Sequence, residues 1–412
     1  MSPNMISAPV RAMLVLGTRP EAIKLAPVAR AMAASPLFEP LVVTTGQHRE
    51  MLHQMLDLLQ VPGRTELDVM RDRQELSTLT ARLVDGLGEV VRDLRPDVVL
   101  VQGDTTTALT GALAAFYEHV PVAHVEAGLR TGVLDNPFPE ELNRRLIGRV
   151  ARWHFAPTPR AAGHLKAEGV PASEVFTTGN TVIDNLLWVL EKGTGQSQFA
   201  HTGTTSGLRR VLLTLHRREN QGDTMRGMGR AIRRLATRGD VEILLPLHKS
   251  PAVRDALLPE LSGHPRVRVV EPLGYLDFSA TLAACDLVLT DSGGVQEEAP
   301  SLGKPALVLR TTTERPEAVE AGAARLVGTV PDAILAATER LLDDPAEYAR
   351  MAEAGNPFGD GHATERIIAQ LAEDFGADAD VPSTGAGVPS TDQSTDQVIA
   401  RLPEGPGSYS TA

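Results

Sequence analysis

Two turns in this sequence combine glycine with residues suited to holding an anion. The later one, Asp291–Glu298, follows the apolar run 287–289 and contains Ser292, Gly293 and Gly294. Glycine lets the backbone come close to an oxyanion, while the first free N–H groups of a helix and its positive dipole end face the negative charge. We therefore expect a strand, a phosphate-binding turn and a helix in this segment.

The earlier turn, 14–21, repeats this plan nearly a whole domain before. Gly17 permits a tight turn, Arg19 can donate two parallel N–H bonds to a phosphate, and Pro20 suits the first position of a helix. Lys24 follows about one helical turn later. Together the two turns predict one phosphate-bearing ligand held from both sides.

Carboxylates follow other apolar runs of the chain. Asp104 comes directly after the run 98–103, Glu126 follows the run 122–125, and Glu140 lies one helical turn before Arg144. Ligands of open parallel sheets bind beyond the carboxyl ends of the strands, so these positions favour chemistry. Acid–base catalysis by these carboxylates is one interpretation.

Each residue also has an ordinary structural interpretation. Asp104 could cap a helix, Glu140 and Arg144 could form a surface pair worth about 0.2–0.5 kcal/mol, and Lys24 could be solvated. His216, after the strand 211–215, is equally compatible with a helix cap and with ligand binding, and the argument for His248 is weaker. The case for chemistry rests on their co-occurrence.

These residues require two doubly wound parallel sheets to position them. Short apolar runs alternate with helical patterns, which predicts α/β architecture. We expect strands at 12–17, 41–45, 98–103, 122–125, 211–215, 243–247, 267–270, 287–290 and 306–309. We expect an N-terminal domain at 10–180, a C-terminal domain at 181–364 with the junction near Gly179, a helix at 365–376 that packs back on the first domain, and a disordered tail at 377–412.

Composition limits the classes of function. The 412 residues include 40 Lys plus Arg and 52 Asp plus Glu, a formal charge of −12, which argues against nucleic-acid and membrane surfaces as partners. The one cysteine, Cys285, cannot form an internal disulfide, and we expect it in the core. With neither a signal sequence nor a long apolar span predicted, we expect a cytoplasmic enzyme.

The motifs, in their order, resemble those of the non-hydrolysing UDP-N-acetylglucosamine 2-epimerase family over about 13–368. The segments that carry the resemblance are 17–21 (GTRPE), 47–51 (QHREM), 103–105 (GDT), 124–131 (HVEAGLRT), 216–220 (HRREN), 291–298 (DSGGVQEE) and 313–317 (TERPE). The resemblance implies a GT-B-like fold with the active site in the interdomain cleft. It also implies interconversion of UDP-GlcNAc and UDP-ManNAc without metal or nicotinamide, in a homodimer that serves cell-surface polysaccharide biosynthesis.

The resemblance further implies roles for individual residues. Asp104, Glu126 and Glu140 would surround the sugar, move the C2 proton and stabilise the cation, and the resemblance leaves open which acid does which. Arg19, Lys24, Arg144 and His216 would stabilise the diphosphate. The remaining nucleotide contacts would come from Phe278 on the uracil side, Ser292, Gly293, Gly294, Glu298 at the ribose, and Arg315. A regulatory UDP-GlcNAc site would involve Gln47, Arg73, Glu140, Arg217 and His248.

Three positions depart from the family pattern. Leu273 stands where many relatives carry a polar side chain near the uracil, Glu50 where some have glutamine, and Lys249 replaces the more usual residue after His248. Rival functions are a hydrolysing epimerase that releases ManNAc, a GT-B glycosyltransferase, and a nucleotide-sugar sensor. A nicotinamide-dependent epimerase is disfavoured because the turn at Gly17 lacks the G-x-G-x-x-G glycines.

Overall fold

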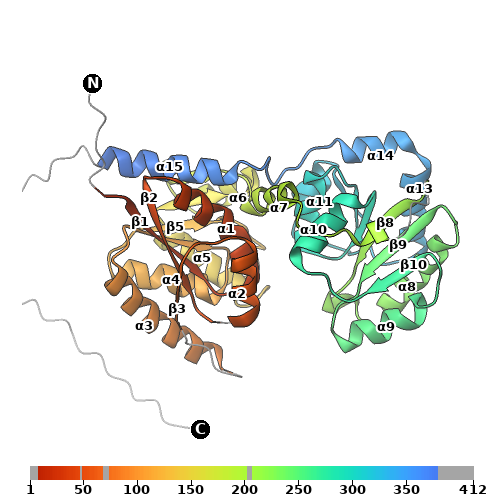
Figure 1. The fold of residues 1–412 in the computed structure, drawn as a ribbon, viewed down its shortest axis with the longest axis horizontal. Helices are drawn as coiled ribbons and strands as arrows, with labels where there is room; N and C mark the ends of the chain where they lie inside the picture. Colours follow the sequence, from red (N-terminus) through yellow and green to blue (C-terminus); the bar gives the residue numbers. More distant parts are fainter. Residues whose placement is uncertain (1–7, 47–48, 68–73, 202–206, 379–412) are drawn as a thin grey trace, which may run out of the picture.

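The computed structural model describes residues 8–46, 49–67, 74–201 and 207–378, which form two α/β domains side by side (Figure 1). Each domain is built on a parallel sheet in which the chain first adds strands outward on one side and then returns to add strands on the other. The predicted pair of doubly wound sheets, in a GT-B-like arrangement, is therefore confirmed.

Within these residues the N-terminal sheet has seven strands in the order β3-β2-β1-β4-β5-β6-β7. The strands are β1 (Val10–Leu16), β2 (Phe38–Thr44), β3 (Arg64–Glu66), β4 (Val98–Gln102), β5 (Val122–Val125), β6 (Trp153–Ala156) and β7 (Val175–Thr177). The helices are α1 (Arg19–Ala34), α2 (Arg49–Leu58), α3 (Leu76–Leu94), α4 (Thr106–Tyr117), α5 (Glu140–Val150), α6 (Pro159–Ala167) and the short η1 (Ala172–Glu174).

The C-terminal sheet has six strands among the described residues, in the order β10-β9-β8-β11-β12-β13. They are β8 (Arg209–Thr214), β9 (Val241–Pro246), β10 (Val267–Val270), β11 (Leu287–Thr290), β12 (Ala306–Val308) and β13 (Ala324–Leu326). The accompanying helices are η2 (Gln198–His201), η3 (Arg218–Asn220), α8 (Asp223–Ala236), α9 (Pro251–Leu261), α10 (Tyr275–Ala284), α11 (Gly293–Ser301), α12 (Pro316–Glu320), α13 (Pro331–Asp343) and α14 (Pro345–Ala352).

Two helices accompany the passages of the chain between the domains. Helix α7 (Thr181–Lys192) packs against α1 and α15 on one side and against α10 and α11 on the other. Helix α15 (Ala363–Asp378) lies along the N-terminal domain, where Ile367 and Leu371 are fully buried in the same core cluster as residues of β1 and α1 (Figure 1). Because α7 contacts both domains, the exact boundary between them stays a prediction.

The central strands are buried on both faces, as expected for parallel sheets covered by helices. Every residue of β4 and β11 is buried, and Cys285 lies in the core, as the sequence predicts. Among the described residues no helix combines the length and apolar character needed to cross a membrane. The segment 379–412 lies outside the described residues, so disorder of the tail stays a prediction.

Candidate functional site

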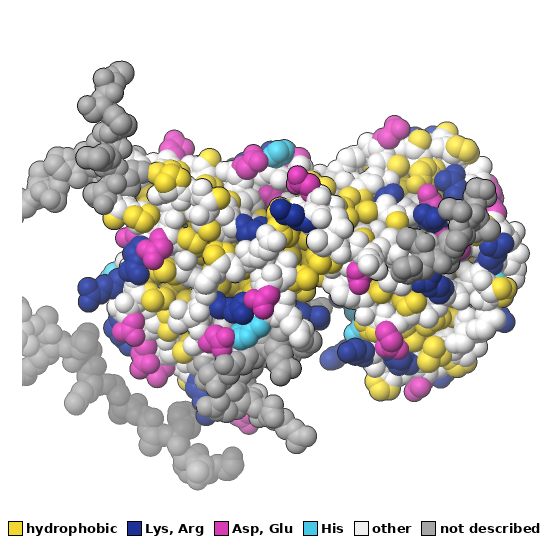
Figure 2. All heavy atoms as spheres, viewed as in Figure 1, with side chains coloured by type: hydrophobic (Ala, Val, Ile, Leu, Met, Phe, Trp, Pro, Cys, Tyr) yellow, Lys and Arg dark blue, Asp and Glu magenta, His cyan; other side chains and the backbone are white. Residues whose placement is uncertain are grey.

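The site lies where the carboxyl ends of the two sheets face each other. A cavity of about 810 Å³ occupies this position, and Figure 2 shows the hollow between the two lobes. In both sheets the strand order reverses between two central strands, β1 and β4 or β8 and β11, which is where ligands of such sheets bind. The cavity is lined by seven of the predicted site residues: Lys24, Asp104, Glu126, Arg144, Arg217, Gly293 and Arg315.

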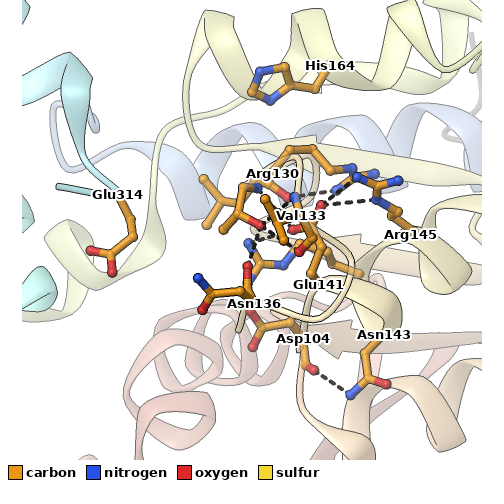
Figure 3. A network of polar contacts seen from close by, with 12 residues as sticks. Asp104, Arg130, Val133, Asn136, Glu141, Asn143, Arg145, His164 and Glu314 are labelled. Carbon is orange, nitrogen blue, oxygen red and sulfur yellow. Dashed lines mark hydrogen bonds and ion pairs between the residues drawn. The ribbon is translucent and has the colours of Figure 1, made fainter. Parts of the chain in front are cut away.

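Asp104 lies in the turn between β4 and α4. Its Oδ2 accepts a hydrogen bond from Arg144 Nη2 at 2.5 Å, and its backbone oxygen accepts one from Asn143 Nδ2 at 2.8 Å (Figure 3). The helix cap is the neighbouring Thr105, whose hydroxyl accepts from Ala108 N–H, so the carboxylate of Asp104 is not used for capping. Burial raises the pKa of Asp104, and the charge of Arg144 offsets this only in part. Such a carboxyl is suited to exchanging a proton.

Glu126 follows β5 in the left-handed backbone conformation, with φ of 62°, and is 8% exposed. This conformation is uncommon outside glycine and occurs at functional sites. Its Oε1 accepts hydrogen bonds from Lys24 Nζ and Asn180 Nδ2, and its Oε2 accepts one from Gln102 Nε2. Burial acts to raise the pKa of Glu126, but the charge of Lys24 and the donated hydrogen bonds hold the pKa below its ordinary value. Glu126 is therefore held ionised inside the cavity.

Glu140 begins α5 and does not form the surface pair with Arg144 that was its ordinary structural interpretation. The partner of Arg144 is Asp104, while Glu141, which is fully buried, lies 3.6 Å from Arg144 and 3.0 Å from Arg145. Glu141 also accepts the Thr131 N–H, so it connects α5 with the preceding loop (Figure 3). Within the described residues Glu140 makes no hydrogen bond or ion pair, but its charge contributes to the raised pKa of Asp104. Glu140 is thus close to Asp104 and unpaired.

Arg19 and Phe278 line a separate, smaller pocket of about 230 Å³. Its other walls come from both domains and are mostly apolar: Pro20, Ile23, Met55, Leu273 and Tyr275. A mostly apolar pocket lined by one guanidinium suits an aromatic ring that carries an acidic tail. Leu273, noted above as a departure from the family pattern, forms part of this wall.

His216 and Arg217 lie in the turn after β8 and are held by Asp291. The Asp291 carboxylate accepts the backbone N–H groups of His216 and Arg217 at 3.0–3.1 Å and lies 3.1 Å from His216 Nδ1. Burial acts to raise the pKa of Asp291, but the bond from His216 and these N–H groups leave it lowered. The His216 ring stacks on His248 with centroids 5.9 Å apart, so the structure brings these two predicted residues together.

The predicted phosphate-binding turn leads into α11. Ser292 is the N-cap residue, but its side chain makes no capping hydrogen bond, and a Cβ placed on Gly294 would meet nothing within 4 Å. Glu298, further along α11, is buried, and burial together with nearby Glu297 raises its pKa to about 8. Arg315 donates from Nε to Glu297. The strand, turn and helix are present as the sequence predicts, while phosphate binding by the turn stays a prediction.

Sequence analysis missed several residues of the site. Glu297 and Asn180 join the two domains, and Glu141 holds Arg144. Signals existed for Asn180, which precedes an apolar helical run as N-cap residues do, and for Glu297, which lies in the motif 291–298. Of the predicted regulatory positions, Gln47 and Arg73 lie outside the described residues. A search of the described residues finds no group of ligands that could hold a metal ion.

The chain is similar to proteins of one family over most of its length. The model of the family described as UDP-N-acetylglucosamine 2-epimerase matches residues 30–372. The chain is 46% identical to the UDP-N-acetylglucosamine 2-epimerase of Bacillus subtilis over 92% of this chain and 99% of that protein. It is 44% identical to a crystal structure of a protein of that description from Listeria monocytogenes, with a TM-score of 0.83 over 90% of this chain and 98% of that one.

A second solved structure is similar along its whole length. The UDP-GlcNAc 2-epimerase of Neisseria meningitidis, solved bound to UDP-GlcNAc, is 42% identical with a TM-score of 0.80 over 88% of this chain and 100% of that one. These comparisons cover both halves of the cavity, so the carboxylates and the phosphate-binding turn both lie within the matched region.

Proposed function

Because the chain belongs to the UDP-N-acetylglucosamine 2-epimerase family, we propose that it reversibly converts UDP-GlcNAc into UDP-ManNAc without hydrolysing it. The observation that carries the proposal is the single cavity that combines Asp104 and Glu126 from one domain with Gly293 and Arg315 from the other. The first pair suits proton transfer at a sugar, and the second suits a pyrophosphate. A ligand that spans both sides has the chemistry of a nucleotide sugar.

The proposed reaction is an elimination followed by re-addition. The hydrogen on C2 is not acidic enough for a carboxylate alone, so the C1–O bond to UDP stretches first and gives C1 oxocarbenium character. A carboxylate then takes the C2 proton, the C2–H electrons form the C1=C2 bond of 2-acetamidoglucal, and UDP leaves with the C1–O electrons. Addition of a proton to the opposite face of C2 and return of the UDP oxygen to C1 complete the epimerisation.

The environments of the carboxylates support a division of labour. Glu126, held ionised by Lys24, suits the acceptor of a proton or the stabiliser of positive charge at C1, while Asp104, whose pKa is raised, suits a donor. Glu140 is unpaired beside Asp104 and completes the carboxylate set proposed around the sugar.

The leaving diphosphate would be held by cations and N–H groups from both domains. Arg19, Lys24, Arg144 and His216 are the proposed cationic or hydrogen-bonding contacts, and the turn Ser292–Gly294 supplies donors at the start of α11. We place the uracil in the pocket beside Phe278 and the ribose near Glu298. Arg315, lining the cavity and bound to Glu297, completes the proposed nucleotide site.

Three further features remain predictions from the family resemblance. We propose a cytoplasmic homodimer, which sedimentation of the purified protein would test for its oligomeric state. We also propose substrate activation through Arg217, His248 and the neighbouring predicted positions. In the forward direction, a sigmoidal dependence of the rate on UDP-GlcNAc concentration would support activation. In the reverse direction, added UDP-GlcNAc should relieve the slow conversion of UDP-ManNAc.

The experiment that tests the reaction is incubation with UDP-GlcNAc in heavy water, without added cofactor, followed by proton NMR. We expect deuterium at C2 of both UDP-GlcNAc and UDP-ManNAc, since solvent supplies the proton at re-addition. Release of free ManNAc and UDP instead would identify a hydrolysing enzyme. Epimerisation without incorporation of deuterium would overturn the proton-transfer mechanism.

A further inference from the structure

Asn180 lies where the chain first passes from one domain to the other, next to the point where it returns. Its backbone N–H donates to the Phe358 oxygen at 2.6 Å. Gly179 and Gly359 both have positive φ, and a Cβ on Gly179 would lie 3.2 Å from the Gly359 Cα. The two passages of the chain therefore touch backbone to backbone, and this contact fixes the base of the Asn180 side chain.

The amide of Asn180 is fully used. Oδ1 accepts the Val182 N–H at 3.2 Å and caps α7, while Nδ2 donates to Glu126 Oε1 at 2.9 Å and to Glu297 Oε2 at 3.1 Å. A flipped amide would place its oxygen against two carboxylates and its N–H groups against a backbone N–H, so chemistry sets this orientation. One nitrogen thus joins a carboxylate of the N-terminal domain to one of the C-terminal domain.

Capping alone does not explain an asparagine here. Ser and Asp cap helices about as well as Asn does, because capping needs only a side-chain oxygen. The two N–H groups are an additional property, and they lie between two buried carboxylates that would otherwise repel each other. Asn180 is 2% exposed, so water cannot take over these hydrogen bonds without rearrangement.

We propose that Asn180 is a positioning residue that fixes Glu126 relative to the C-terminal domain, and this role rests on the function proposed above. The cleft must hold a sugar beside Glu126 while the diphosphate of the same ligand contacts the C-terminal domain. The position of the Glu126 carboxylate relative to that domain therefore decides how well it is aligned with C2 of the sugar. A hydrogen bond that spans the passage between domains provides that alignment. Asn180 does not line the cavity, which separates its role from that of Glu126 itself.

The charged and titratable groups that face Glu126 come from several elements. They are Lys24 of α1, Asp104 after β4, His124 of β5, Glu297 of α11 and Arg315 before α12. Lys24 and Arg315 favour the ionised form of Glu126, whereas the two other carboxylates oppose it. Asn180 is uncharged and donates to the ionised carboxylate, so its loss weakens the support for that form without changing the net charge.

The test compares two variants that keep the helix cap. Asn180→Ser retains an acceptor for the Val182 N–H but loses both donors to the carboxylates. We expect kcat to fall about 10- to 100-fold, as for a lost hydrogen bond to a charged group, while KM for UDP-GlcNAc and Kd for UDP change less than about threefold. The acidic limb of the kcat–pH profile should move to higher pH. Asn180→Asp, which turns an acceptor toward two carboxylates, should move it further.

Asn356→Ser is the matched control, because Asn356 lies on the returning passage and donates to the Glu297 backbone oxygen and to Ser301, not to Glu126. We expect it to alter thermal stability without moving the pH profile. If the wild type is active and Asn180→Ser has the same kcat and the same pH profile, the proposed role of Asn180 is overturned. Equal effects of Asn180→Ser and Asn356→Ser on kcat and on the pH profile would overturn it as well. A wild type that does not epimerise UDP-GlcNAc would instead overturn the proposed function.

Discussion

The two domains have sheets of the same winding, yet the helices that follow their central strands differ in their first turns. In the N-terminal domain the start of α1 is satisfied from within. The Glu21 carboxylate accepts the N–H groups of Gly17 and Thr18 and the Thr105 hydroxyl, and Thr18 caps the helix in return. An anion that approached these N–H groups would meet a carboxylate already there.

At the start of α11 in the C-terminal domain the Ser292 N–H donates to the Thr290 hydroxyl at 2.9 Å, but within the described residues no carboxylate accepts the N–H groups of the first turn. Ser292 makes no capping bond with its side chain, and Gly293 and Gly294 place no Cβ over the first turn. The N–H groups of Gly293 and Gly294 and the positive end of the helix dipole are therefore available to a phosphate. Equal topology therefore does not give equal sites: a carboxylate occupies the first turn of α1, whereas the first turn of α11 has room for an anion. The difference supports the proposal that the N–H groups that bind the diphosphate lie on the C-terminal side, with acid–base groups on the N-terminal side.

The largest expected effect comes from an acid on the N-terminal side. Asp104→Asn keeps the shape of the side chain but removes its ability to exchange a proton. We expect kcat to fall by about 10²- to 10⁴-fold, the usual contribution of positioned acid–base catalysis, while Kd for UDP changes only a few fold. Turnover assays and calorimetric titration with UDP measure the two quantities.

Asp255→Asn, at an exposed position of α9, controls for the change of residue type in the Asp104 experiment. Equal losses of turnover and UDP affinity in Asp104→Asn would show that Asp104 supports the cavity as a whole. The proposed separation of acid–base and phosphate sides would then break down.

A smaller effect should follow from obstruction of the open helix end. Gly294→Val places a branched side chain where the free protein has space, so folding should be preserved while close approach of a phosphate is blocked. Loss of one charge-assisted hydrogen bond, worth about 1.5–3 kcal/mol, predicts a fall in UDP affinity of roughly 10- to 100-fold. Calorimetric titration with UDP measures it.

Gly376→Val, an exposed and equally open helical position in α15, is the matched control for Gly294→Val and should leave UDP affinity unchanged. If Gly294→Val bound UDP normally, the diphosphate would not contact this turn. The contrast between the two helix ends would then carry no functional meaning.

The sequence was sufficient to predict the fold because apolar runs and turn residues report directly on parallel strands. The nine predicted strands all exist, with ends displaced by no more than a few residues. The short edge strands β3, β7 and β13, and the strand β6, were missed. The three edge strands have three residues each and contain a polar or charged residue, unlike the equally short β12, so too little apolar pattern distinguishes them from loops.

The site was predictable only in part, because partners in space leave little trace in a sequence. Glu140 and Arg144 have the spacing of a helical pair, but Arg144 turns to Asp104, 40 positions away, and the neighbouring Glu141 takes the buried position. Asn180 likewise shows only the signature of a helix cap. Its contacts with Glu126 and Glu297 exist because two domains meet there, and no local pattern reports that meeting.

The smallest expected effect, at most about 1.4 kcal/mol for each pH unit, concerns the stability contributed by the buried acid Glu298 on the phosphate side. Burial and nearby Glu297 raise the pKa of Glu298 to about 8, well above the ordinary value of 4.5. The folded protein therefore binds a proton at this site that the unfolded chain has released above pH 4.5. The resulting stability is fully present below pH 4.5 and is lost as the pH rises through about 8.

Glu298→Gln stays neutral at every pH and lacks this dependence. The free energy of unfolding of the variant minus that of the wild type should increase by at most about 1.4 kcal/mol between pH 7 and pH 8. This difference should not increase further well above pH 8. Urea unfolding across pH 5–9 measures this difference, and Glu353→Gln at an exposed position of the same domain is the control. Parallel curves for wild type and Glu298→Gln would mean that the acid is ionised in the free protein. The phosphate side would then hold an uncompensated negative charge beside the open helix, and the electrostatic contrast with the N-terminal side would be lost.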